Sequence, residues 1–309
     1  MITTVTLNPA IDRMYYIDSL ESNDVVRCNN YNINAGGKGL NVTKVLVKLQ
    51  AEVQCFGFIG GSAGNFVTKE LEKLGAVNKF TKIDRETRTC LSIMDTTGKQ
   101  FELVESGPQI KADEIERFIL TFNDINESKT LVMSGSLPKG LEDNFYRTLI
   151  SKANQKGVKV VLDTSGNPLK EGIKENPFLI KPNIEELRKL LNRDFNTEDD
   201  LLKGTLDCLK LGAQNVALSL GGDGMIFSNQ DASYRVKVSK VKVVSPVGSG
   251  DSTVAGLAYG INNELGIRET LALANACGAS NATMAGIGQI NFKQVQDLKE
   301  KIEVSKVRG

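Results

Sequence analysis

The stretch VVSPVGSGDSTVAGLAYG, residues 243–260, joins an apolar, β-branched run to a segment of small residues with helical spacing. Pro246 ends the run, and Asp251 opens the helical segment after two glycines. This order predicts a strand, a tight glycine turn and a helix N-terminus. Gly248 and Gly250 allow backbone N–H groups to converge, and the start of a helix adds partial positive charge. The stretch therefore indicates an anion site, most naturally for phosphate.

Asp251 stands at the mouth of this expected anion site, where a carboxylate should repel the anion. Its presence is explained if the carboxylate takes a proton from a hydroxyl while the backbone amides stabilise a phosphoryl group in transfer. The other interpretation is an N-capping aspartate after an ordinary glycine turn. The stretch alone leaves both interpretations open.

The composition of the chain excludes several kinds of catalysis and of partner. The 309 residues carry a net charge of +1, so no broad basic field indicates nucleic acid or a membrane surface as a partner. There is no histidine, which removes Ser-His-Asp and Cys-His catalysis and every His-ligated metal site. The five cysteines are scattered and form no C-x-x-C pair, which is typical of a reduced intracellular protein. With no leader-like or membrane-spanning stretch, we expect a cytoplasmic protein.

β-prone runs alternate with helical patterns along most of the chain. The expected strands cover residues 2–7, 53–59, 130–134, 158–163 and 215–219, and a last strand enters the stretch at 243. The expected helices lie within residues 35–49, 64–74, 112–125, 142–156, 198–211, 251–263, 267–284 and 291–303. This alternation predicts βαβ units and an α/β fold, with a mainly parallel sheet covered on both faces. Since no linker interrupts the pattern, we expect one domain over residues 1–309.

Such sheets bind ligands at the carboxyl ends of their strands. Polar residues gather just past the expected strand ends at Asp12, Ser134 to Ser136, Asp163, Lys181 to Asn183, Ser219 to Gly224 and Gly248 to Asp251. The sequence therefore predicts that the functional site lies along this edge of the sheet.

Two parts of the chain contain too few apolar residues to be core strands of a parallel sheet. Short β-prone runs fall within residues 12–34, and a hairpin around Thr97-Gly98 falls within residues 88–104. We expect these parts to form a small β-sheet that is inserted in the domain as a lid.

Between them, AGGKGLNVTKVLVKL at residues 35–49 predicts a glycine turn followed by an amphipathic helix. Lys38 lies in the turn and Asn41 in the first helical turn. Three glycines around a lysine indicate a backbone cradle with a cation aimed into it. An ordinary glycine turn before a helix is an equally good interpretation of this segment.

The familiar phosphate- and nucleotide-binding designs are absent. The lysine of G-G-K-G is followed by Gly39, so there is no P-loop, and no G-x-G-x-x-G follows the first strand. The protein-kinase motifs require a histidine that the chain lacks. A chain of this sequence that moves phosphate must therefore do so by another design.

In their order and spacing, the motifs resemble those of the ribokinase-like sugar kinases of the PfkB group, and more narrowly its phosphosugar branch. These motifs are TLNPAID at 6–12, INAGGKGLNV at 33–42, SGSLP at 134–138, KPNIEEL at 181–187, SLGGDG at 219–224 and PVGSGDS at 246–252. Each is weak alone, and together they span essentially the whole chain. The resemblance implies a ribokinase-like three-layer α/β/α fold with a mainly parallel central sheet and a small β-sheet lid.

The resemblance also implies roles for individual residues. Asp251 is the general base, and the amides of Gly248, Ser249 and Gly250 form the anion hole. Lys38 and Arg88 supply the cations for a phosphate already on the sugar. The other implied substrate-binding residues are Asp12, which binds sugar hydroxyls, Gly37, Asn41 and Ser136. The implied nucleotide-binding residues are Lys181, Asn183, Ser219, Gly221, Gly224 and Asn275, and Glu186 with Asn183 helps to hold Mg²⁺, largely through water.

Two ketohexose phosphates compete as the expected substrate. ETRTCLSI at 86–93, SPVGSGDS at 245–252 and AGIGQIN at 285–291 look more like tagatose-6-phosphate kinases, whereas 1-phosphofructokinases tend to have V-G-A-G-D-S-M. GGSAGN at 60–65 lacks the Asp that kinases of unphosphorylated sugars usually carry there.

The resemblance thus leads us to expect an ATP- and Mg²⁺-dependent kinase that converts D-tagatose 6-phosphate to D-tagatose 1,6-bisphosphate. The alternative is a 1-phosphofructokinase, and a remote one is an inactive regulator that binds sugar phosphates. The family also implies a homodimer formed through the lid.

Overall fold

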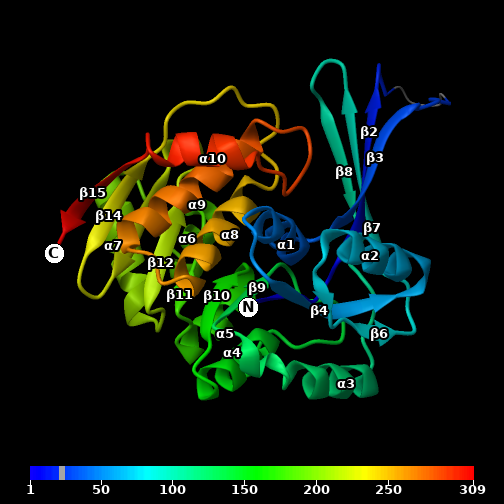
Figure 1. Ribbon diagram of the computed structural model, residues 1–309, viewed down its shortest axis with the longest axis horizontal. Helices are drawn as coiled ribbons and strands as arrows, with labels where there is room; N and C mark the ends of the chain where they lie inside the picture. Colours follow the sequence, from blue (N-terminus) through cyan, green and yellow to red (C-terminus); the bar gives the residue numbers. More distant parts are fainter. Residues whose placement is uncertain (21–24) are drawn as a thin grey trace.

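The computed structural model describes residues 1–20 and 25–309 of the chain. Residues 21–24, which fall within the expected lid segment, lie outside the described residues. The described residues form an 11-stranded sheet and a separate 4-stranded sheet. Figure 1 shows the smaller sheet rising beside the helix-covered main body.

The main sheet has the strand order β15-β14-β13-β12-β11-β10-β9-β1-β4-β5, and β6 also pairs with β4. All neighbours from β12 through β4 to β5 and β6 pair in parallel, whereas β13, β14 and β15 are added antiparallel at one edge. The mainly parallel sheet is therefore confirmed. The strands are β1 (Ile2–Thr6), β4 (Val53–Gly60), β5 (Val77–Asn78), β6 (Thr81–Ile83), β9 (Thr130–Ser134), β10 (Lys159–Asp163), β11 (Leu179–Ile180), β12 (Asn215–Ser219), β13 (Met225–Asn229), β14 (Ser233–Lys237) and β15 (Glu303–Arg308).

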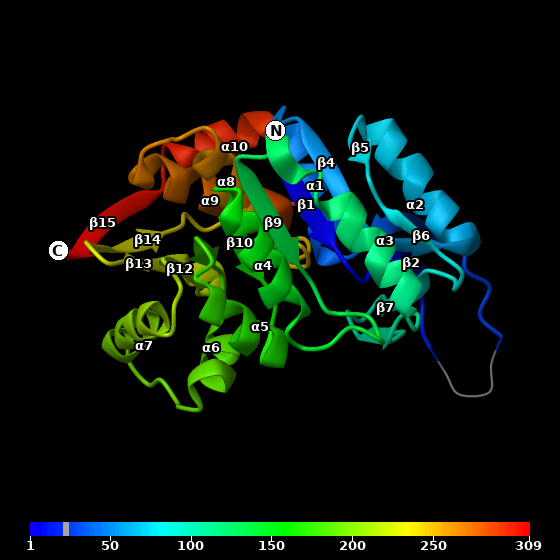
Figure 2. The same cartoon turned by 90° about the horizontal axis from the view of Figure 1, so that it is seen from below.

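Helices cover both faces of this sheet, which gives the three layers seen edge-on in Figure 2. One face packs against α1 (Lys38–Lys48), α2 (Gly61–Leu74), α8 (Ser249–Asn262), α9 (Ile267–Ala282) and α10 (Phe292–Lys299). The other face packs against α3 (Ala112–Phe122), α4 (Phe145–Gln155), α5 (Gly166–Gly172), α6 (Ile184–Leu191) and α7 (Glu198–Lys210).

Side chains of the central strands alternate between the two cores. In β10, Val161 packs into the first core, and its neighbours Val160 and Leu162 pack into the second. Because both faces are buried, these strands are continuous apolar runs rather than alternating ones. Among the described residues, no helix has the length and apolar character needed to cross a membrane.

The small sheet has the strand order β3-β2-β7-β8, with β3 (Asn30–Gly36), β2 (Ala10–Ile17), β7 (Arg88–Asp95) and β8 (Gln100–Val104). β2 and β7 pair in parallel, and the two outer pairs are antiparallel. This sheet is the lid, and its hairpin turns at Thr97-Gly98 as predicted, with Gly98 at a φ of 85°.

The prediction of a strand at Val243 and Val244, leading into the glycine turn, is wrong. β14 ends at Lys237, and the segment up to Gly248 is irregular, with Val243 58% and Val244 59% exposed. β14 already has β13 and β15 as its neighbours, so the later segment has no open sheet edge beside it. The β-branched residues of this segment line a cavity instead, as described below.

Two smaller expectations also differ from the structure. The helix predicted over residues 291–303 ends at Lys299, because Glu303–Arg308 forms β15 on the antiparallel edge. Asp12 does not follow a strand end but lies within β2 of the lid. The chain thus brings Asp12 to the site from the small sheet and not from the main one.

Candidate active site

The carboxyl edge of the parallel strands gathers the predicted polar residues. Ser134 and Asp163 are the last residues of β9 and β10, and Lys181 follows β11 directly. The first turns of α1 and α8 point at the same edge, because these two helices pack side by side. The site therefore lies where this edge meets the base of the lid.

Asp251 lies in the first turn of α8 and is buried. Its Oδ2 accepts a hydrogen bond of 2.9 Å from Nδ2 of Asn41 in α1. Burial, followed by the nearby charge of Asp163, raises the pKa of Asp251 to about 6, although Asn41, Lys38 and Lys181 oppose the shift. A carboxylate with such a pKa is deprotonated near neutral pH and is basic enough to accept a proton from a substrate hydroxyl.

The glycine turn before Asp251 has the geometry of an anion site. Gly248 adopts a left-handed conformation with a φ of 81°, which favours glycine. Gly250 lies in the first helical turn, where N–H groups have no helical acceptor. A methyl group on Gly250 would lie 3.7 Å from Lys181 Nζ, so an ammonium borders this turn. The N–H of Ser249 donates to the carbonyl of Pro246 at 3.2 Å, so one of the three predicted amides closes the turn itself.

Asp163 connects the two lysines of the site. Its Oδ1 lies 3.2 Å from Lys181 Nζ, and its Oδ2 lies 3.5 Å from Lys38 Nζ and accepts a 2.9 Å hydrogen bond from Ser134 Oγ. Burial raises the pKa of Asp163, but the two ammonium groups and Ser134 outweigh burial and hold that pKa below its usual value. The same carboxylate is the main reason why the pKa of Lys38 is raised. Asp163 thus favours the charged form of Lys38 and holds both lysines at the edge of the sheet.

The structure gives the two predicted phosphate-binding cations different surroundings. Lys38 Nζ lies between Asp163 and Glu186 Oε1, which is 4.0 Å away. Arg88 Nη1 and Nη2 donate to the backbone carbonyls of Glu105 and Asn8 at 2.9 and 3.0 Å. Arg88 therefore fixes the base of the lid, whereas Lys38 belongs to the charged cluster at the sheet.

Asn183 and Glu186 cap the N-terminus of α6 reciprocally. Asn183 Oδ1 accepts from the N–H of Glu186 at 2.8 Å, and Glu186 Oε2 accepts from the N–H of Asn183 at 2.9 Å. This leaves Glu186 Oε1 for other contacts. A carboxylate oxygen is a hard ligand of the kind that Mg²⁺ takes, and Mg²⁺ is usually bound by one or two carboxylates together with several waters.

A cavity of about 590 Å³ lies beside the glycine turn and is lined by five of the six predicted nucleotide-binding residues, namely Asn183, Ser219, Gly221, Gly224 and Asn275. The sixth, Lys181, does not line this cavity, whereas Ser249 and Gly250 of the glycine turn do. Its apolar lining includes Val238, Val241 and Val243, so these β-branched residues line a cavity and are not in a strand. An apolar slot that ends at an anion site fits a molecule with a flat apolar part and a phosphate chain.

A second cavity, of about 170 Å³, lies under the lid. Asp12 of β2 lines it together with Asn32, Asn34, Cys90 and Glu102 of the lid, and residues 285–287 close it from the loop after α9. A methyl group on Gly36 would lie 2.1 Å from the Asp12 carboxyl carbon, so this glycine makes room for the side chain. Burial raises the pKa of Asp12. These carboxyl and amide groups suit sugar hydroxyls as ligands.

The remaining predicted substrate residues lie at or next to the turns that join the lid to the main body. Gly37, with a φ of 104°, precedes the first residue of α1. Ser136 Oγ accepts a 3.2 Å hydrogen bond from Asn8 Nδ2, and Asn8 also holds Arg88. Sequence reasoning assigned no role to Asp163, which is recognisable beforehand only as a carboxylate at a strand end, and did not single out Lys44 of α1.

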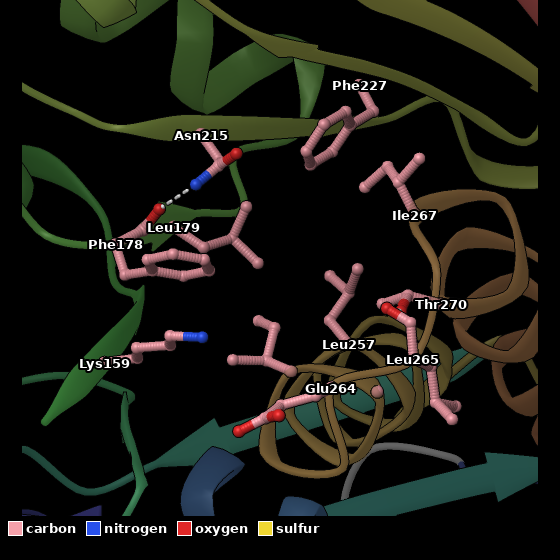
Figure 3. Close-up of a pocket in the computed structure, with 12 residues that line it drawn as sticks. Lys159, Phe178, Leu179, Asn215, Phe227, Leu257, Glu264, Leu265, Ile267 and Thr270 are labelled. Carbon is pink, nitrogen blue, oxygen red and sulfur yellow. Dashed lines mark hydrogen bonds between the residues drawn. The ribbon is translucent and has the colours of Figure 1, made fainter.

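A further cavity, of about 190 Å³, lies at the opposite end of α8 (Figure 3). Leu257, Phe178 and Phe227 make it mainly apolar, with Lys159 and Glu264 at its rim. It adjoins the amino ends of β10 and β12 and is therefore separate from the site at the carboxyl edge.

Comparisons with known proteins agree with this geometry. Residues 5–291 match the pfkB family carbohydrate kinases. The chain is similar to phosphofructokinase-2 from Escherichia coli, with 26% identity and a TM-score of 0.91 over 97% of this chain and 98% of that chain. It is also similar to a Staphylococcus aureus structure described provisionally as a phosphofructokinase, with 30% identity and a TM-score of 0.88 over 100% of both chains.

A third structure, described as a possible 1-phosphofructokinase from Thermotoga maritima, shares the fold, with 24% identity and a TM-score of 0.89 over 99% of both chains. The family match covers the lid strands, the glycine turn and the nucleotide cavity. The protein therefore belongs to the pfkB family of carbohydrate kinases.

Proposed function

We propose that the protein is an ATP-dependent kinase of a ketohexose phosphate, and that its substrate is D-tagatose 6-phosphate. The main support for a kinase is the position of Asp251. This buried carboxylate has a pKa of about 6, and it lies beside the glycine turn and next to the cavity proposed for the nucleotide. A sugar hydroxyl gives its proton to Asp251 while its oxygen attacks the γ-phosphorus in line, and ADP leaves. The amides of the turn and the ammonium groups of Lys38 and Lys181 stabilise the charge that develops on the transferred group.

Mg²⁺ would be held at Glu186 and Asn183, mainly through its waters, and supplies positive charge to the triphosphate. Lys38 adds to that charge from the sheet side, since its ammonium lies near Glu186. Asn41 orients the base, and Asp12 holds hydroxyls of the sugar.

The preference for tagatose 6-phosphate rests on three sequence stretches, 86–93, 245–252 and 285–291. Cys90 and Ser92 of the first, Val247 of the second and residues 285–287 of the third line the cavity under the lid. The residues that look like those of tagatose-6-phosphate kinases therefore lie where a sugar would contact them. The alternative, 1-phosphofructokinase, is supported by the shared fold of the Thermotoga maritima structure.

An ADP-release assay with ATP-Mg²⁺ distinguishes these substrates. We expect the highest kcat/KM for tagatose 6-phosphate among tagatose 6-phosphate, fructose 1-phosphate, fructose 6-phosphate and fructose. We also expect kcat/KM to fall below about pH 6, because the base becomes protonated there. A higher kcat/KM for fructose 1-phosphate would establish the alternative, and turnover of fructose alone would contradict a phosphosugar kinase.

Arg88→Ala should raise the KM for the sugar phosphate by about 10- to 100-fold, because a charge-assisted bond to phosphate contributes about 1.5–3 kcal/mol. The KM for ATP should stay within about twofold, since Arg88 is at the base of the lid. Steady-state kinetics with each substrate varied in turn measure both values. Arg85→Ala, an exposed neighbour, is the matched control. An equal rise in both KM values would contradict a role in binding the sugar's phosphate.

We further propose a homodimer formed through the outer face of the lid. The register places Leu91 opposite Leu103 and Ile93 opposite Phe101, so these four apolar side chains share one face. Leu103 is 65% and Phe101 47% exposed. The opposite face carries Asp12, Cys90 and Glu102 toward the cavity. A contiguous exposed apolar face of this kind is typical of a protein–protein contact.

Leu103→Glu should therefore convert the dimer to a monomer, because it places a charge in the centre of the proposed contact. Analytical ultracentrifugation measures the change in mass. Leu211→Glu, at an exposed leucine of the main body, should leave the mass unchanged. A Leu103→Glu protein that sediments like the unsubstituted protein would place the contact elsewhere.

A further inference from the structure

Three polar side chains of α1 follow one another at helical spacing along the helix surface beside α8: Lys38, Asn41 and Lys44. Asn41 Nδ2 donates to Asp251 Oδ2 at 2.9 Å. Lys44 Nζ donates to the other end of the same amide, Asn41 Oδ1, at 3.1 Å. We infer that Lys44 is a positioning residue for the phosphoryl-acceptor site, and that it acts on the base Asp251 through Asn41. This inference rests on the proposed function.

The two charges together select one orientation of the Asn41 amide. A carboxylate only accepts hydrogen bonds and an ammonium only donates them, so the NH₂ group must face Asp251 and the oxygen must face Lys44. The flipped amide would oppose its oxygen to the carboxylate and its NH₂ group to the ammonium. Lys44 therefore strengthens the preference that directs a donor at the base.

The surroundings of Lys44 leave this as its direct polar contact. In residues 1–20 and 25–309, the Lys44 side chain has no ion pair within 4.0 Å and its one hydrogen bond is to Asn41. Burial lowers its pKa, and the carboxylates of Asp12, Asp251 and Glu70 oppose that shift. Glu70 itself pairs with Lys73 at 2.7 Å. The ammonium of Lys44 is partly removed from water and lies near these acids, yet its side-chain hydrogen bond is to an amide. Its position is therefore better explained by orientation of that amide than by a salt bridge.

Asp251 is also faced by Asp163 from β10, by Lys38 from α1 and by Lys181 from the end of β11. Lys44→Met leaves these groups in place and removes the charge that fixes Asn41, a charge that also acts on Asp251 directly. Because the bond from Asn41 lowers the pKa of Asp251, loosening it should move the acid limb of kcat/KM to higher pH. A move of about one pH unit from pH 6 lowers the fraction of charged base about twofold at pH 7 and about fivefold at pH 6.

We therefore expect Lys44→Met to lose activity increasingly as pH falls, with the KM for ATP unchanged. Lys48→Met, at an exposed lysine one turn further along α1, is the matched control and should keep the profile of the unsubstituted protein. Lys44→Gln, which keeps a polar side chain, takes its place if the Met variant folds poorly. In an Asn41→Ala background, Lys44→Met should shift the acid limb less than it does alone, because the amide that transmits the effect is gone.

The titration of the Asp251 carboxyl, followed by ¹³C NMR in the protein without substrate, separates this inference from the proposed function. The inference holds if Lys44→Met raises that titration midpoint, whichever sugar the enzyme uses, and raises it less in the Asn41→Ala background, where only the direct effect of the lysine charge remains. A pH-independent loss of activity with an unchanged midpoint would mean that Lys44 is merely structural. A rise confined to the KM for the sugar would mean that Lys44 contacts substrate directly, and an equal shift in both backgrounds would exclude action through Asn41. Each of these three results would overturn the inference.

Discussion

Asp251→Asn is expected to lower kcat by about 100- to 10,000-fold, the range contributed by general base catalysis. The amide keeps the size of the side chain and still accepts the hydrogen bond from Asn41, but it cannot take a proton from the sugar. ATP and the sugar phosphate should therefore bind with nearly unchanged affinity, because the anion-binding turn and the lid cavity are intact. Single-turnover kinetics measure the loss, and calorimetric titration measures both affinities.

The same substitution should make the protein more stable at neutral pH. The folded-state pKa of Asp251 is about 6, above the ordinary value of 3.8. Above pH 6 the carboxylate is charged in both states, and its charge is less favourable in the folded protein than in the unfolded chain, so it lowers the free energy of unfolding. At about 1.4 kcal/mol per pKa unit, removing this charge should stabilise the fold by about 1–3 kcal/mol at pH 7. Well below pH 3.8 both states carry a neutral Asp251, and the gain should vanish. Urea unfolding at the two pH values measures it.

Asp297→Asn, at an exposed residue of α10, is the control for both effects and should change neither. If Asp251→Asn kept more than about a tenth of kcat, Asp251 would be an N-terminal helix residue and not the base. Loss of kcat without the pH-dependent gain in stability would mean that the carboxylate is better solvated than its burial indicates.

The glycine turn, the alternation of strands and helices and the lid could be predicted because each depends on local sequence. Gly248 needs a left-handed φ and the hairpin turns at Gly98, and neither requirement involves distant residues. The strand at Val243 was predicted wrongly for the complementary reason. A β-branched run indicates a strand only where a sheet edge is open, and here β15 already occupies the edge beside β14.

The roles of Asp163 and Lys44 could not be predicted, because both depend on which elements become neighbours. Asp163 acquires Ser134 from β9 and Lys181 from the end of β11 only after the parallel strands align. Lys44 lies off the apolar stripe of α1 and resembles a solvent-facing lysine, yet the packing of α8 on α1 places Asp251 within reach of Asn41 beside it. The sequence pattern predicted the base, and the groups that shift its pKa come from β10, α1 and the end of β11.

Asp163→Asn should be among the most destabilising conservative substitutions at the site. It leaves Lys181, which is 6% exposed, as a buried ammonium without its carboxylate. Leaving one partner of a buried ion pair uncompensated typically costs about 3–5 kcal/mol. Since the pKa of Asp163 is depressed in the folded state, its contribution is present above the ordinary pKa of 3.8 and is lost as pH falls through the lower folded value. The free energies of unfolding of the unsubstituted protein and of Asp163→Asn, measured in urea, should therefore become more similar as the pH falls.

Two comparisons make this expectation specific to the buried pair. Asp113→Asn breaks an exposed pair with Arg117 in α3 and should cost less than about 0.5 kcal/mol. Asp163→Asn combined with Lys181→Met removes both charges and should be less destabilised than Asp163→Asn alone. A double variant as unstable as the sum of its parts would mean that the two side chains stabilise the fold independently.

The effect of Asp163→Asn on catalysis should run opposite to that of Lys44→Met. The charge of Asp163 raises the pKa of Asp251, whereas Lys38 and Lys181 lower it. Removing the carboxylate and keeping both lysines should therefore move the acid limb of kcat/KM below pH 6. Lys44→Met and Asp163→Asn would then shift the pKa of Asp251 in opposite directions. Such a pair of results requires that Asp251 be the titrating group, whereas a shift of the same sign in both variants would assign the acid limb to another residue.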